Sequence, residues 1–218
     1  MTGLESSFRL SVAIPLYNEE DSLPELLRRL KAVLDQVPGG PHEIVCVDDG
    51  SHDRTAEILD QAASADERLV VVRLSRNFGH QAALSAGLDH VTGDAVVMMD
   101  ADLQDPPEAI LQLLGRWQEG YDVVYARRAR RKESWLLRLS YFVFYRLLAS
   151  MSDVRLPLDA GDFAILSRRV VETLRGAPER HRYLRGLRSW AGFRQTGVDV
   201  ERAPRAAGAS KYTARKLF

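Results

Sequence analysis

Two carboxylates lie one residue apart in Asp100-Ala-Asp102, directly after the apolar run Ala95–Met99. Side chains at this spacing that leave a buried strand can address the same hard cation, which takes oxygen ligands. Gln104 offers a further oxygen ligand or a hydrogen-bond donor. Such a cation would neutralise a diphosphate leaving group as its charge develops. An isolated Asp-x-Asp pattern is more often a helix cap, here ahead of Pro106, or a solvated loop.

A second acidic pair, Asp48-Asp49, follows the apolar run Glu43–Val47. One of these carboxylates can accept hydrogen bonds from a base or a ribose, and the other can cap the turn on the Asp53 side. Two acidic strand ends on one sheet edge repel each other unless a cation or a ligand offsets their charge. Together the two pairs favour a ligand site over capping alone.

Both acidic pairs lie where short apolar runs alternate with amphipathic segments. This pattern predicts strands at Phe8–Ile14, Glu43–Val47, Leu69–Leu74, Ala95–Met99 and Tyr121–Tyr125. It predicts helices from a capping box at Ser22–Glu25 to about Gln36, from an Asp53 cap through Ala63, over Phe78–His90, and from Pro106 to Glu119. The alternation indicates an α/β fold whose mostly parallel sheet has helices on both faces. Ligands bind beyond the carboxyl ends of such strands, so the polar loops after the first four strands should converge on one edge.

The second part of the chain has a different character. Residues 1–126 contain 9 Lys and Arg against 22 Asp and Glu, a balance of −13, and residues 127–218 contain 21 against 8, a balance of +13. This asymmetry favours a cation site in the first part and an anionic partner for the second, with solvated surface charge as the alternative. The aromatic, Arg-containing segment Trp135–Met151 is predicted either as a core helix or as an amphipathic helix in a membrane interface. Further elements are expected at Asp159–Leu166, Arg168–Arg175, Glu179–Leu187 and Arg194–Val200, before a basic tail from Arg202 to Phe218.

Composition excludes several classes of protein. The 218 residues are 45% hydrophobic, which is enough for a core, and the single cysteine, Cys46, cannot form an intrachain disulfide. No apolar run reaches the roughly 18 residues of a membrane span, and the N-terminus lacks a signal-peptide pattern. The loop Pro15–Glu19 has no Gly-x-Gly-x-x-Gly, which argues against a dinucleotide-dependent oxidoreductase.

Four motifs occur in a specific order: Ile14-Pro-Leu-Tyr-Asn-Glu19, Val47-Asp-Asp-Gly-Ser51, Arg76-Asn-Phe-Gly79 and Asp100-Ala-Asp-Leu-Gln-Asp-Pro106. In this order they resemble the signature of glycosyltransferase family two, over about residues 8–212. More narrowly, they are similar to the polyprenyl-phosphate hexose synthases. The resemblance implies a GT-A fold, a nucleotide-sugar donor and Mg²⁺ or Mn²⁺ as cofactor.

The resemblance also implies roles for residues of the first part. The nucleotide would be held by Pro15, Tyr17, Glu19, Asp48, Asp100 and Ala101. The metal and the diphosphate would be bound by Asp100, Asp102 and Gln104. Tyr17 would stack on the base, with a place in the wall of the core as the alternative.

In the second part, Asp159-Ala-Gly-Asp162-Phe163 resembles the segment that faces the sugar and the acceptor. The sequence from Arg205 to Tyr212 resembles a basic loop that closes over the phosphates. The implied catalytic residues are Asp102, Asp159, Asp162, Arg205 and Lys211, and the implied acceptor-phosphate ligands are Arg127, Arg131, Arg205, Ser210 and Lys211. Which of the two aspartates matters more stays open.

These features predict inverting transfer of a hexose from a nucleotide sugar, with UDP-hexose favoured over GDP-mannose, to undecaprenyl or dolichyl phosphate. A soluble or polysaccharide acceptor, and a non-catalytic nucleotide-sugar-binding module at a membrane, are the alternatives. We expect a nucleotide-sugar half at 1–126, an acceptor half at 127–212 with its interfacial helix at about 135–151, and the start of a membrane-anchoring region at 213–218. The expected location is the cytoplasmic face of a membrane, without a nucleic-acid partner.

Overall fold

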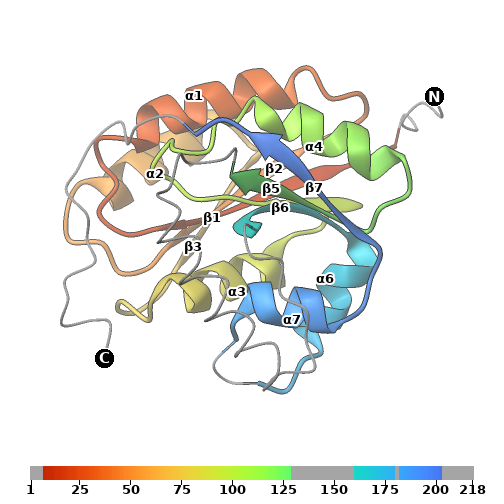
Figure 1. Cartoon of the computed structure of the whole chain (residues 1–218). Coiled ribbons are helices and arrows are strands. Elements are labelled where there is room, and N and C mark those ends of the chain that lie inside the picture. Colours follow the sequence, from red (N-terminus) through yellow and green to blue (C-terminus); the bar gives the residue numbers. More distant parts are fainter. Residues whose placement is uncertain (1–6, 129–159, 180–181, 203–218) are drawn as a thin grey trace, which may run out of the picture.

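A computed structural model describes residues 7–128, 160–179 and 182–202. They form one sheet with helices on both faces (Figure 1). The strands are β1 (Leu10–Leu16), β2 (Glu43–Asp48), β3 (Leu69–Arg73), β4 (Ala95–Met98), β5 (Val123–Arg128), β6 (Ala160–Ser167) and β7 (Gln195–Val200). The helices are α1 (Leu23–Leu34), α2 (Thr55–Ala65), α3 (His80–His90), α4 (Ala109–Gln118), α6 (Arg168–Arg175) and α7 (Leu184–Trp190). The strand order is β3-β2-β1-β4-β6-β5-β7.

The first four strands form the parallel part of the sheet. β1 pairs with β2 and β4, and β2 pairs with β3, all in parallel. Every residue of β1, β2 and β4 is buried. Strands covered on both faces read as continuous apolar runs, which is why these segments were recognisable in the sequence. The predicted mostly parallel α/β sheet is confirmed.

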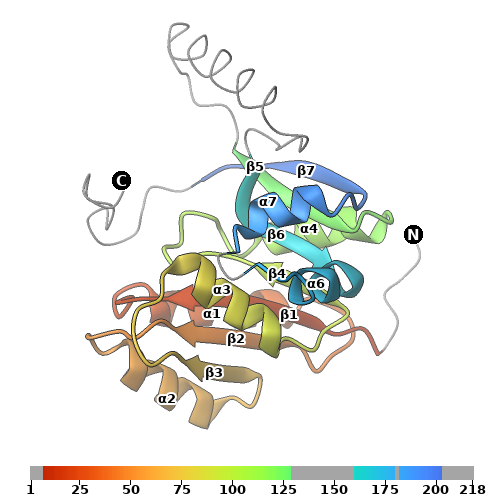
Figure 2. The same ribbon diagram turned by 90° about the horizontal axis from the view of Figure 1, so that it is seen from below.

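Helices on opposite faces enclose two separate cores. Leucines at helical spacing in α1 pack with Leu59 of α2 and Leu113 of α4 against one face. On the other face, residues of α3, α6 and α7 form the second core, including Leu84, Val171 and Leu184. Figure 2 shows α3, α6 and α7 together on this side of the sheet. Helices therefore cover both faces of the sheet, and the loops surround only the strand ends.

The strand β6 lies antiparallel between β4 and β5. Its register with β4 pairs Val97 with Ile165 and Met98 with Ala164. If this register is continued by two residues beyond Met98, Asp100 comes opposite Asp162. The expected segment at Asp159–Leu166 is thus a central strand, and its position could not be read from local periodicity because the partner is far away in the chain.

Several helix and strand boundaries differ from the predicted ones, and the predicted capping box at Ser22 is wrong. β1 begins and ends two residues later than the expected Phe8–Ile14, and α7 begins at Leu184 instead of Glu179. Ser22 makes no side-chain capping bond, because its own backbone is already helical. Its hydroxyl instead lies 2.8 Å from the Glu19 carboxylate, so the predicted capping box is not formed.

The predicted interfacial helix at about 135–151 lies outside the described residues. Among the residues that the structure describes, no helix is both long and apolar enough to cross a membrane.

Candidate active site

The loops after β1 and β2 are joined by hydrogen bonds. The backbone N–H of Asn18 donates to Ser51 Oγ at 3.0 Å, and Asn18 Oδ1 accepts the backbone N–H of His52 at 2.8 Å. Asn18 has a φ of 54°, a left-handed conformation that asparagine tolerates better than most residues. These bonds bring the Tyr17 ring edge-on to His52, with 6.3 Å between the ring centroids. An aromatic pair therefore lies where the sequence predicted a nucleobase.

The two carboxylates after β2 have separate partners. Asp48 is buried, and its Oδ1 accepts the N–H of Ser51 at 2.9 Å. Asp49 accepts the N–H groups of Phe78 and Gly79 at 2.7 and 2.9 Å. Asp48 therefore shapes its own turn, and Asp49 holds the loop after β3. A contact between Asp48 and a nucleotide stays a prediction.

The loop after β2 requires a glycine at position 50, where it meets the loop after β3. Gly50 has a φ of 69°, and a Cβ atom built there would lie 2.7 Å from the carbonyl carbon of Arg76. The loops after β2 and β3 therefore touch through their backbones, and the predicted convergence of polar loops on one edge is confirmed for the loops after β1, β2 and β3.

At the centre of this edge, His80 lies between two carboxylates. Its Nε2 is 3.5 Å from Asp100 Oδ1 and 3.6 Å from Asp162 Oδ2. Asp100 follows β4, Asp162 lies in β6 and His80 begins α3. The antiparallel register of β4 and β6 thus brings together an acidic residue from each half of the chain. Asp162 was predicted as a site residue, but His80 was not.

Burial and neighbouring charges shift the pKa values of these groups. Burial raises the pKa of Asp100, and repulsion from Asp162, Asp102 and Asp105 adds to this effect. Burial also opposes ionisation of Asp162, but the nearby His80 ring and the charge of Arg185 lower its pKa to about 2. The interaction with Asp162 raises the pKa of His80. Asp162 is therefore a carboxylate at neutral pH, which accepts hydrogen bonds and does not donate them.

Two arginines of α7 complete this side of the site. Arg185 lies with Nη2 3.3 Å from Asp162 Oδ2. Arg188 is 1% exposed and donates to the carbonyl of Gly161 at 3.4 Å. Within the described part of the chain, its Nε and Nη1 have no hydrogen-bond partner. Burial lowers the pKa of Arg188 to about 10, so it still carries a positive charge at neutral pH.

The loop after β4 is braced by Arg202, at the end of the described chain. Arg202 donates from Nε to Asp105 Oδ1 at 2.7 Å and from Nη2 to Asp105 Oδ2. Its Nη1 lies 3.4 Å from Gln104 Oε1, so the predicted metal ligand Gln104 faces this arginine here. Asp102 Oδ1 accepts the N–H of Gln104 at 3.1 Å. A shallow recess is lined by Asp105, Ala126, Arg127, Gly161, Val200 and Arg202.

The residues of the Asp-x-Asp motif fit a divalent cation. Asp100 Oδ1 is buried without a hydrogen-bond partner, although His80 lies near it. A buried carboxylate oxygen without a donor is costly unless a cation or ligand meets it. Among the described residues, no group of three or more His, Cys, Asp or Glu side chains forms a metal-binding cluster. Mg²⁺ in phosphate-transferring sites is commonly held by one or two carboxylates together with substrate phosphates, so this donor set is suitable.

The remaining residues predicted for the site lie on several separate elements and loops. Pro15 lies in β1 beside Val47, and Ala101 is buried at 4% exposure. Arg127 forms an ion pair with Asp199 of β7, with 2.6 Å between Nε and Oδ1. Glu19 Oε2 accepts the hydroxyl of Ser22. The other predicted residues lie outside the described part of the chain: Arg131, Asp159, Arg205, Ser210 and Lys211.

Sequence reasoning missed His80, Arg185, Arg188 and the Asp105–Arg202 pair. A signal for His80 was present, because it directly follows Arg76-Asn-Phe-Gly79, one of the four motifs. The α7 arginines carried no such signal, because they belong to a short helix in an already arginine-rich region.

Comparison with known proteins identifies relatives for most of the chain. The family model "Glycosyl transferase family 2" matches residues 11–175. The uncharacterized glycosyltransferase YkcC of Bacillus subtilis is 45% identical over 95% of this chain and 64% of its own length. The bactoprenol glucosyl transferase of Shigella phage SfX is 38% identical over 96% of this chain and 69% of its own. The undecaprenyl-phosphate 4-deoxy-4-formamido-L-arabinose transferase of Enterobacter sp. (strain 638) is 37% identical over 100% and 67%.

The chain spans about two thirds of the length of these relatives. Among solved structures, the mannosyltransferase PcManGT from Pyrobaculum calidifontis, in complex with GDP-Man and Mn²⁺, matches with a TM-score of 0.67 at 23% identity. That match covers 94% of this chain and 59% of the other, and it shows a shared GT-A fold.

Proposed function

The chain belongs to glycosyl transferase family 2, and we propose that it transfers a hexose from a nucleotide sugar to a polyprenyl phosphate with inversion at the anomeric carbon. The observation that carries this proposal is that Asp100 and Asp162 both approach His80, at the edge where the β1, β2 and β3 loops converge. The relatives named for bactoprenol and for undecaprenyl phosphate support the class of acceptor.

The donor nucleotide would lie over the loops after β1 and β2. The Tyr17 and His52 rings are adjacent there and offer a surface on which a base can stack. The hydrogen bonds between the two loops hold this surface before a ligand arrives, which reduces the ordering cost of binding. UDP-hexose is the favoured donor, with GDP-mannose as the second candidate.

Asp100 and Asp102 would hold Mg²⁺ or Mn²⁺. When bound, the ion would offset the charge that develops on the diphosphate as it leaves. Gln104 would join the ligand set only by turning away from Arg202. The chain's own residues position the reacting groups: Asp105 and Arg202 brace the loop that carries the Asp-x-Asp motif.

The acceptor phosphate would supply the attacking oxygen. A phosphate monoester has a second pKa near 6, so at neutral pH this oxygen is already largely ionised and needs no strong base. Asp162, with its pKa of about 2, is then suited to orient the sugar or the acceptor by accepting hydrogen bonds. Arg127, which lines the recess, would contact the acceptor phosphate, together with Arg131, Arg205, Ser210 and Lys211.

We place this reaction at the cytoplasmic face of a membrane, because the proposed acceptor is a lipid. In this arrangement residues 1–126 bind the nucleotide sugar and residues 127–212 bind the acceptor. The helix at about 135–151 would lie in the membrane interface, and a membrane-anchoring region would begin at 213–218.

The proposal is tested by incubating the 218-residue chain with UDP-glucose, Mn²⁺ and undecaprenyl phosphate in detergent. We expect a glycolipid detectable by mass spectrometry and release of UDP that requires the lipid phosphate. UDP release with free sugars or oligosaccharides, and none with the lipid, would indicate a soluble or polysaccharide acceptor. Nucleotide binding without turnover under any of these conditions would indicate a non-catalytic module.

The identity of the donor needs a separate measurement. Thermal-shift assays with UDP- and GDP-sugars, each with and without Mn²⁺ or Mg²⁺, would rank the candidates, because a ligand that binds the folded state raises the melting temperature. A larger shift with GDP-mannose than with any UDP-hexose would contradict the favoured donor.

A further inference from the structure

His80 lies between the carboxylates of Asp100 and Asp162, which come from different halves of the chain. Its Nε2 lies almost equally far from Asp100 and Asp162, at 3.5 and 3.6 Å. Two carboxylates on either side of one imidazole nitrogen repel each other, and this repulsion is strong where burial lowers the local dielectric. The His80 ring, which lies between the two carboxylates, can offset this repulsion and so limit their separation.

The position of His80 is itself determined by the loop after β2. Asp49 binds the N–H groups of Phe78 and Gly79, the two residues that precede His80. Gly50, which follows Asp49, lies so close to the backbone of Arg76 in the loop after β3 that a Cβ atom would clash there. A continuous set of contacts therefore runs from the turn beside Asp48, through His80, to Asp162. On its other side Asp162 meets Arg185 of α7, 3.3 Å away.

We propose that His80 is a positioning residue that links the donor-binding loops to Asp162 and so holds the acceptor-side carboxylate beside the Asp-x-Asp motif. The expected effect of His80 on kcat rests on the proposed function. The structural role of His80, to keep Asp100 and Asp162 together, is independent of the reaction.

Replacing His80 should therefore impair the chemical step more than donor binding. Asp162 would turn toward Arg185 alone, and a misplacement of about 1 Å at a reacting centre can lower the rate about 10²-fold. We expect His80→Ala to lower kcat about 10²-fold and to change the KM for the nucleotide sugar by less than about threefold. His80→Gln keeps an N–H donor on a side chain of similar reach, so it should restore kcat to within about tenfold of the wild type.

His90 provides a matched control. It is the last residue of the same helix α3, is exposed, and its Nδ1 lies 2.8 Å from the Ala86 carbonyl. His90→Ala should have the kcat and KM of the wild type. Wild-type kcat in His80→Ala, or a raised KM with unchanged kcat, would overturn the proposal. So would a His80→Gln variant as impaired as His80→Ala.

A second measurement separates this inference from the proposed function. Crystal structures of the wild type and His80→Ala should show the Asp100 and Asp162 carboxylates further apart in the variant. If the wild type transfers no sugar to any lipid phosphate, the proposed function fails, but these structures still test His80. Unchanged carboxylate positions in the folded variant would overturn the positioning role, whatever the activity.

Discussion

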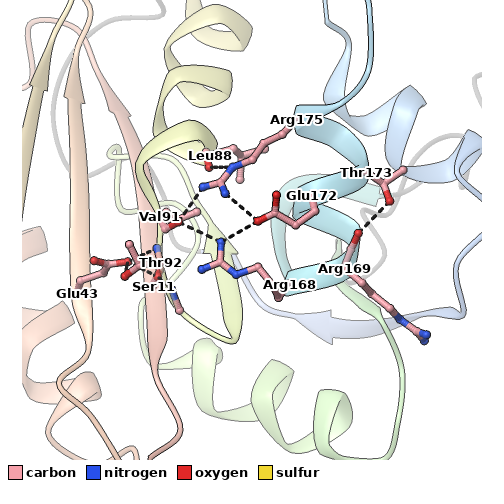
Figure 3. A network of polar contacts seen from close by, with 11 residues as sticks. Ser11, Glu43, Leu88, Val91, Thr92, Arg168, Arg169, Glu172, Thr173 and Arg175 are labelled. Atoms are coloured by element: carbon pink, nitrogen blue, oxygen red, sulfur yellow. Dashed lines mark hydrogen bonds and ion pairs between the residues drawn. The ribbon is translucent and has the colours of Figure 1, made fainter.

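Charged side chains are buried at both ends of the sheet, but their surroundings differ. At the end where β1 and β2 begin, the Glu43 carboxylate accepts hydrogen bonds from Ser11, Arg9 and both the N–H and hydroxyl of Thr92. Nearby, Arg175 of α6 donates to the carbonyls of Leu88 and Val91 (Figure 3). At this end, within the described residues, the buried side-chain atoms without a hydrogen-bond partner are Arg9 Nε and Gln195 Oε1.

The opposite end leaves more of its buried charge unsatisfied. Asp100 Oδ1 and two nitrogens of Arg188 have no hydrogen-bond partner among the described residues. Unsatisfied buried polar atoms cost about 1–3 kcal/mol each, so a fold keeps them chiefly where a ligand uses them. The difference indicates that the end with Glu43 contributes mainly to stability and the end with Asp100 mainly to function. This division can be tested by mutation.

The largest expected effect is at the Asp-x-Asp motif. Asp102→Ala should lower transfer by about 10³-fold or more, because a proposed metal ligand is lost. The fold should remain, since Asp102 lies in the loop after β4 and accepts its hydrogen bond from Gln104 within the same loop, outside the sheet and its two cores. The checks are kcat and the melting temperature, with Glu119→Gln, at the exposed C-cap of α4, as a control. Substantial turnover by a folded, metal-saturated variant would rule out the metal assignment.

The next effect is expected at the opposite end and concerns stability. Glu43→Gln places an amide in contact with Arg9 and loses a charged hydrogen bond, which should lower the free energy of unfolding by about 1–3 kcal/mol. kcat should not change. Urea denaturation would measure the difference, with the exposed Glu25→Gln, paired with Arg28 on α1, as a control. A loss of activity without a loss of stability would contradict the division between the two ends.

Two arginines allow a matched comparison. Arg188→Met removes a buried charge with unsatisfied nitrogens, so the free energy of unfolding should stay the same or rise by about 1 kcal/mol. Transfer should fall about tenfold, because Asp162 loses a nearby positive charge. Arg175→Met should have the opposite effects. The free energy of unfolding should fall by about 1 kcal/mol, because the hydrogen bonds to the carbonyls of Leu88 and Val91 are lost, and activity should not change. Identical behaviour of the two variants in denaturation and transfer assays would remove the distinction.

The smallest effect is a pH dependence at Glu43. Burial would raise its pKa, but the hydrogen bonds from Ser11 and Thr92 and the charge of Arg9 lower it below the ordinary value. A carboxyl with a lowered folded-state pKa stabilises the protein above its unfolded pKa, and this contribution is lost as pH falls through the folded value. The stability difference between wild type and Glu43→Gln should be constant above about pH 5 and shrink below about pH 4. A difference that grows on acidification would contradict this assignment.

Much of the fold followed from local patterns. The apolar runs of β1, β2 and β4 were visible because both faces of these strands are buried. The helices between them had the spacing of an apolar stripe. The capping box at Ser22 failed because hydrogen-bond geometry at a helix end depends on the entering loop, here tied to Ser51 and Thr55. Boundaries near strand and helix ends shifted for the same reason.

The sequence by itself determined that acidic loops follow parallel strands and must meet at one edge, since the carboxyl ends of parallel strands lie together. The tertiary structure decided which residues meet there. The insertion of β6 between β4 and β5, antiparallel to β4, brings Asp162 and Asp100 to the two sides of His80 and places Arg185 of α7 beside Asp162. Pairing of distant strands depends on the packing of the whole sheet and leaves no local period in the sequence. The role of His80 appears only once that pairing is known.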